Sequence, residues 1–140
     1  MTHAFERRKL EVFFAMLTTG FGAWLLFPSV AMDSPALVHA LALMPEPQWG
    51  WLFLTNGFAH CTWLAVNGAR WWSPILRFWA AFMAGCLYLL WCASIAAYDA
   101  SSTGVFSYGA LSVGSWACCV FAWRDAISAV RVHRAVTDHA

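Results

Sequence analysis

Residues Trp49–Trp72, WGWLFLTNGFAHCTWLAVNGARWW, form an apolar run with tryptophans at both ends. An α-helix rises 1.5 Å per residue, so about 20 residues cover the roughly 30 Å core of a bilayer. Tryptophan is enriched where such helices leave the hydrocarbon, and here Trp49 and Trp72 mark the two ends. The run predicts a membrane-spanning helix over about residues 49–69.

Three polar side chains interrupt this apolar run. Asn56, His60 and Asn67 follow each other at spacings of four and seven, which places them along one face of a helix. Polar groups inside a membrane are costly and are candidates for function. This polar stripe either makes hydrogen bonds to neighbouring helices or lines a cavity in which His60 gains a proton.

The composition of the whole chain points to lipid as its solvent. Of 140 residues, 61% are hydrophobic and 11% are charged, against about 25% charged in soluble proteins. The formal net charge of +1 gives no electrostatic basis for binding nucleic acid. All five cysteines fall in apolar segments, where we interpret them as small packing residues.

Three further apolar runs predict helices over about residues 10–27, 75–98 and 105–123, and residues 124–140 form a polar cytoplasmic tail. Between the first two spans, Asp33-Ser34-Pro35 is a helix-start signal. The segment of about ten residues that follows is too short to span a bilayer and predicts an interfacial helix in the first outer loop. The predicted fold is therefore an all-α membrane protein with four transmembrane helices in one domain, residues 1–140.

Small residues recur at helical spacing in three of the four runs. They let membrane helices approach closely where the hydrophobic effect between helices is absent. Thr18 and Gly22 are such a pair in the first run. The candidate packing residues of the later runs are Ala81, Gly85, Ala110, Gly114 and Cys118.

Charge gives the orientation. With the four helices as predicted, all eight basic residues fall on one side, and the opposite loops hold Asp33, Glu46 and Asp99. The positive-inside rule then predicts that both termini lie in the cytoplasm. The side chains expected to anchor it at the two membrane surfaces are Arg70, Arg77, Arg124, Trp49 and Trp72.

Several short features together resemble small, uncharacterised four-helix membrane proteins of tailed phages, prophages and proteobacteria. They are a tryptophan-opened helix, an Asn-Gly pair, a proline shortly before an arginine, an STG turn and an Arg-Asp-Ala near the last helix. Here these are Trp49, Asn67-Gly68, Pro74 with Arg77, Ser102-Thr103-Gly104 and Arg124-Asp125-Ala126. The resemblance implies a phage or bacterial inner-membrane context, and it supplies no catalytic residues.

The sequence predicts no enzyme, because it holds no nucleophile and base pattern, phosphate loop or paired intramembrane carboxylates. We expect no cofactor and no metal, since a haem bound by His60 would need a second axial ligand on a facing helix. Three functions stay open: self-association or partner binding in the membrane, including holin-like permeabilisation; an accessory subunit of a larger complex; and a small transporter or channel. The expected partners are the lipid bilayer, further copies of the chain or other membrane proteins.

Overall fold

A computed structural model describes residues 2–27, 34–66 and 70–137, and every regular element in these ranges is helical. The long helices are α1 (Thr2–Leu25), α3 (Glu46–Ala65), α4 (Ser73–Tyr98) and α5 (Thr103–Thr137). A 3-10 turn, η1 (Pro35–Leu37), leads into the short helix α2 (Val38–Leu43). The predicted all-helical architecture is confirmed.

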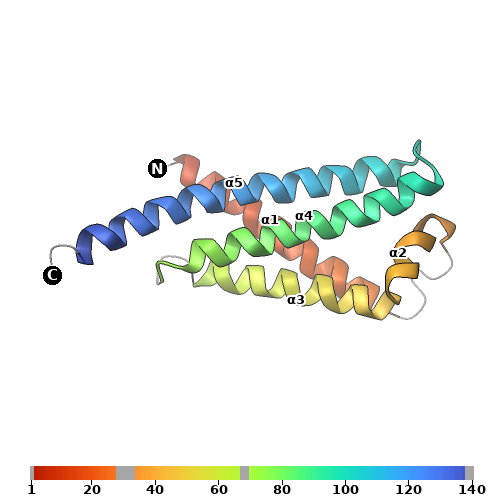
Figure 1. Cartoon of the computed structure of the whole chain (residues 1–140), viewed down its shortest axis with the longest axis horizontal. Helices are drawn as coiled ribbons and strands as arrows, with labels where there is room; N and C mark the ends of the chain where they lie inside the picture. Colours follow the sequence, from red (N-terminus) through yellow and green to blue (C-terminus); the bar gives the residue numbers. More distant parts are fainter. Residues whose placement is uncertain (1, 28–33, 67–69, 138–140) are drawn as a thin grey trace.

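The four long helices lie side by side, with α1 crossing the others obliquely (Figure 1). The most extensive contacts join α4 to α5 and α1 to α3, and α3 also packs against α4. The start of α1, the end of α3, the start of α4 and the end of α5 lie toward one end of the bundle; α2 and the α4–α5 turn lie at the other (Figure 1). All basic residues of the described helices and turns therefore gather toward one end.

Among the described residues, two helices are long and apolar enough to cross a membrane: α4 and the Thr103–Arg131 part of α5. Helices α1 and α3 do not qualify by the same measure of hydropathy and charge. The first turns of α1 are charged, and α3 carries Gln48, Asn56 and His60 besides its tryptophans. The four-span architecture therefore needs support beyond hydropathy.

The helix ends differ from the predicted ones in ways that local chemistry explains. Helix α1 includes the charged residues before Leu10, and α5 continues past Trp123 to Thr137, because neither segment contains a helix breaker. Helix α3 begins at Glu46, with Pro47 in its first turn, where the missing N–H of proline costs nothing. It ends at Ala65, and Asn67 lies outside the described residues.

The short segment η1–α2 packs onto α4 and covers one end of the aromatic core. Its Ala40 backbone N–H donates to Ser94 Oγ at 3.0 Å, and that hydroxyl donates to the Ala36 carbonyl at 3.1 Å. Leu37 and Ala40 are buried, whereas Val38 and Leu43 are exposed. One face of the segment thus packs on the protein, and the other faces outward.

Trp49 corrects one prediction. It lies in the core, 1% exposed, in edge contact with Trp91 and near Phe53, and so it cannot anchor the protein at a membrane surface. Its indole Nε1 donates to the Ala40 carbonyl at 3.0 Å. The nearby helix α2 supplies this acceptor and covers the ring, which the sequence of α3 alone does not reveal.

The α4–α5 turn is fixed by Asp99, which lies outside the apolar segments. Its Oδ1 accepts hydrogen bonds from the Ser101 hydroxyl at 2.7 Å and from the Ser101 backbone N–H at 2.9 Å. These bonds favour the ionised carboxylate, so they hold the pKa of Asp99 below its ordinary value.

Helices α1 and α3 approach closely through glycines. A methyl group on Gly22 would clash with the Leu54 backbone, and one on Gly57 would clash with Thr19. Gly20, on the same helix as Gly22, has nothing within 4 Å of where its Cβ would lie. The close packing expected of the first helix is thus found at two places, at Gly22 and at Thr19.

We expect Gly22→Ala to destabilise the bundle by about 1–3 kcal/mol, because α1 and α3 must separate to admit the methyl group. Gly20→Ala is the matched control and should be neutral or stabilising by up to about 1 kcal/mol, since alanine favours the helix. Unfolding of the purified protein in detergent, followed by circular dichroism, measures both. Equal stability of the two variants would contradict the close approach.

Candidate functional site

The main polar site inside the bundle is an ion pair between α1 and α4. Arg77, in the second turn of α4, is fully buried, and Glu11 of α1 is 1% exposed. Arg77 Nε donates to Glu11 Oε2 at 2.9 Å, and Nη2 donates to Glu11 Oε1 at 2.7 Å. This two-pronged geometry uses the planar fork of the guanidinium and is the strongest form of such a pair.

A third charge connects the pair to α5. Arg77 Nη2 also donates to Asp125 Oδ2 at 3.1 Å, and the Asp125 side chain is 39% exposed. The charged cluster, Glu11–Arg77–Asp125, therefore holds three helices together and reaches the surface on the α5 side. It contains two carboxylates and one guanidinium, so it retains an excess negative charge when both acids are ionised.

The cluster corrects the prediction for Arg77. That arginine was expected to extend to the lipid headgroups, but it points into the protein, where the attraction of Glu11 offsets part of the cost of burying it. The sequence did contain a signal: Glu11 and Arg77 are opposite charges within two apolar runs, and charges at membrane depth usually pair. Of the other predicted anchors, Arg70 and Arg124 are exposed and Trp72 is half-buried.

The described members of the polar stripe both lie between α3 and its neighbours. Asn56 Nδ2 donates to the Ala80 carbonyl of α4 at 3.0 Å, a hydrogen bond between helices. His60 is 2% exposed, and its Nε2 has no hydrogen-bond partner among the described atoms. The stripe thus combines one packing contact with one unsatisfied ring nitrogen.

The predicted small packing residues fall mostly inside the bundle. Ala81, Gly85 and Cys118 are buried, Gly114 is half-buried and Ala110 is exposed. A methyl group on Gly85 would meet the Trp116 indole, and one on Gly114 would meet the Phe14 ring. Four of these five residues therefore pack within the bundle, and Ala110 alone among the five faces outward.

Side-chain hydroxyls make further hydrogen bonds between the helices. Thr18 Oγ1 and the Tyr88 hydroxyl lie 3.2 Å apart, Ser112 donates to the Gly85 carbonyl at 2.9 Å, and Ser73 donates to the Trp63 carbonyl at 2.9 Å. All five cysteines are free thiols. In the part of the chain that the structure describes, no cluster of three or more His, Cys, Asp or Glu side chains could hold a metal ion.

Comparison of the chain with protein-family models, with curated proteins and with solved structures gives no match in any of the three. Any function proposed for the protein therefore depends on its own sequence and geometry.

We expect Arg77→Gln to cost about 3–5 kcal/mol of stability, because it leaves Glu11 buried without a charge partner. The double variant Glu11→Gln, Arg77→Gln should cost less than the sum of the two single variants, since it removes both charges together. Chemical unfolding of the purified protein in detergent measures the free energy of unfolding of the two single variants and of the double variant.

Arg124→Gln is the matched control, because it removes the same charge from an exposed side chain one residue before Asp125. Its effect should stay within about 0.5 kcal/mol. Additive losses in the double variant, or an Arg77→Gln loss no larger than that of the control, would show that the pair does not stabilise the bundle.

Proposed function

We propose that the protein is a multi-pass protein of the bacterial inner membrane, with α1, α3, α4 and α5 crossing the bilayer and both termini in the cytoplasm. Large apolar side chains on the outer surface of all four helices support this. They include Phe13 and Met16 of α1, Trp51 and Phe58 of α3, Phe82 and Leu90 of α4, and Phe106 and Val113 of α5. A surface of this kind is stable when lipid covers it.

The spans of α1 and α3 are supported by what they pack against. Helix α3 has 20 residues and is about 30 Å long, which matches the hydrocarbon core. It lies beside α1 and α4, and α4 is one of the two helices that are long and apolar enough to cross a membrane. Two of the polar side chains that lower the hydropathy of α3, Asn56 and His60, face the interior of the bundle, which lowers the cost of placing them in a membrane.

Within this membrane context, we infer that the protein acts by self-association or by binding another membrane protein. The observation that carries the inference is the use of interior polar groups for contacts between helices, above all Glu11–Arg77–Asp125. Because these polar groups are used inside the bundle, the apolar outer surface is the part available for binding another protein. This apolar outer surface and the resemblance to phage and prophage proteins together support a holin-like role. In that role, several copies of the chain would permeabilise the membrane.

The orientation can be tested with reporter fusions. We expect alkaline phosphatase inserted in the α4–α5 turn, after Ala100, to be active, because that enzyme matures only outside the cytoplasm. Green fluorescent protein fused after Ala140 should fluoresce, since it matures in the cytoplasm. An inactive phosphatase in the turn, or a dark C-terminal fusion, would contradict the proposed topology.

For the holin-like role, we expect induced expression in a bacterium to collapse the membrane potential, measured with a potential-sensitive dye. Arg77→Gln is the control, because it should enter the membrane but pack poorly. Loss of potential with the native chain and not with the variant supports a property of the folded bundle. Unchanged potential and normal growth with the native chain would remove the holin-like role.

Purification in mild detergent distinguishes self-association from an accessory role in a larger complex. An assembly of this chain alone supports the first, and a stoichiometric second protein supports the second. The transporter alternative has one observation in its favour, the buried His60 with an unsatisfied ring nitrogen. It requires that His60→Ala abolish flux in vesicles while the protein still folds, and flux equal to that of the native chain would exclude it.

A further inference from the structure

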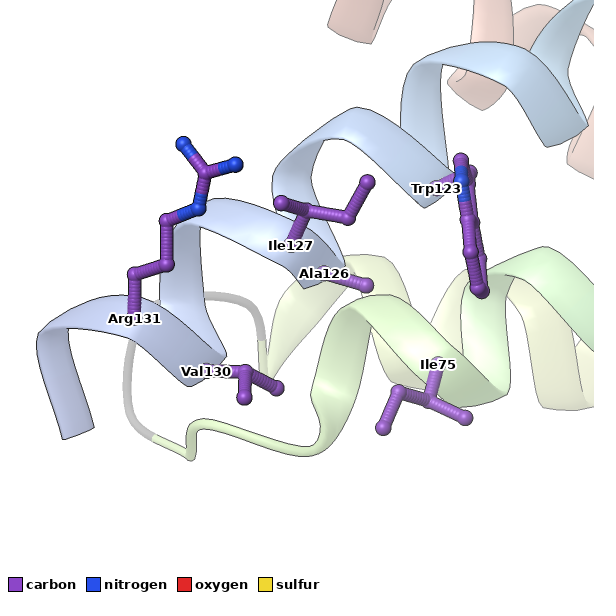
Figure 2. A pocket seen from close by; sticks show the side chains of 6 residues that line it. All are labelled: Ile75, Trp123, Ala126, Ile127, Val130 and Arg131. Carbon is purple, nitrogen blue, oxygen red and sulfur yellow. The ribbon is translucent and has the colours of Figure 1, made fainter. Parts of the chain in front are cut away.

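A groove runs between α4 and the second half of α5, toward the end of the bundle where the basic residues gather. It encloses about 390 Å³ and is lined by Ile75 of α4 and by Trp123, Ala126, Ile127, Val130 and Arg131 of α5. Figure 2 shows Trp123 at one end and Arg131 at the other, with the guanidinium clear of the apolar side chains. Its lining is apolar throughout except for this one exposed cation.

A second hollow of about 310 Å³ continues this groove on the other side of Trp123. Phe78 of α4 and Cys119 and Val120 of α5 line it. The two hollows share Trp123, so they form one furrow along α5 from Val120 to Arg131. The twelve residues from Val120 to Arg131 are separated by eleven rises of 1.5 Å, about 16 Å in all, close to the roughly 15 Å of hydrocarbon in one leaflet.

The furrow lies where α5 leaves the membrane in the proposed architecture. Helix α5 has 35 residues and is about 52 Å long, well beyond the hydrocarbon core. Its apolar part, Thr103–Arg131, has 29 residues and is about 43 Å long, close to the roughly 40–45 Å of a bilayer with its headgroup regions, so Arg131 lies at the cytoplasmic headgroups. Asp125 bound to Arg77, and the His133 ring stacked on Trp71 at 5.1 Å, hold this part of α5 against the bundle.

We propose that this furrow binds one anionic phospholipid of the cytoplasmic leaflet, with an acyl chain along Val120, Trp123 and Ile127 and the phosphate at Arg131. The apolar walls match the chain, and the cation at the headgroup end matches the negative charge. The proposal rests on the membrane topology inferred above, which places this end of α5 at the cytoplasmic surface.

Tryptophan fluorescence gives a direct test, because bromine on an acyl chain quenches an indole that it touches. The full chain is placed in phosphatidylcholine vesicles that contain about 10 mol% of either brominated phosphatidylglycerol or brominated phosphatidylcholine. Subtracting the signal of Trp123→Phe isolates Trp123, and the substitution is mild because that side chain is 55% exposed. We expect phosphatidylglycerol to quench Trp123 about fivefold more effectively than phosphatidylcholine does.

The charge variants show whether Arg131 recognises the lipid. Arg131→Gln should abolish the preference for phosphatidylglycerol, whereas Arg124→Gln, an equal charge change outside the furrow, should keep most of it. Equal quenching of Trp123 by the two lipids overturns the proposal. An equal loss of preference in both variants also overturns it, because the attraction would then belong to the basic surface as a whole.

Trp79 separates failure of this site from failure of the proposed membrane topology. It is also 55% exposed, lies on α4 and does not line the furrow. If both lipids quench Trp79 but neither quenches Trp123, a second copy or another protein covers the furrow, and the lipid proposal is wrong. If neither lipid quenches either tryptophan, these helices do not face lipid, and the membrane proposal fails as well.

Discussion

The contact between Arg77 and Glu11 constrains the rest of the structure. A guanidinium that is removed from solvent must find an opposite charge, and removing either partner of such a pair is strongly destabilising. Glu11 lies on α1 and Arg77 on α4, and Asp125 extends the same contact to α5. Once these charges meet, the relative positions of three helices are fixed at one end of the bundle.

The other end is held together by a different kind of interaction. There Phe21, Trp49, Phe53, Tyr88, Trp91 and Tyr108 form a continuous set of ring contacts between four helices. Gly22, next to Phe21, and Gly57 let the backbones of α1 and α3 approach closely. Charge pairing, glycine packing and an aromatic core thus all hold the helices of the bundle together. All three direct specific groups inward, which supports a function carried by the apolar outer surface.

Much of the architecture followed from apolar runs and punctuation in the sequence. The helical segments, the short helix before α3 and the turn at Asp99 were all predicted, because each depends on local composition. The errors concern side-chain partners. Trp49 and Arg77 were placed at the membrane surface by rules that hold for average tryptophans and arginines. Each is buried because a neighbour from another element supplies its hydrogen bonds: Ala40 for Trp49, and Glu11 with Asp125 for Arg77.

The sequence by itself determined that the chain is helical, that it is unusually apolar, and that its positive charges lie on one side of the predicted spans. These properties depend on residue type and spacing along one helix. The tertiary structure alone decided which polar groups meet: Glu11 with Arg77 across 66 residues, Asn56 with Ala80, and Trp123 between two hollows of one furrow. Helical periodicity gives the face of a side chain, but the crossing and rotation of packed helices choose what that face contacts.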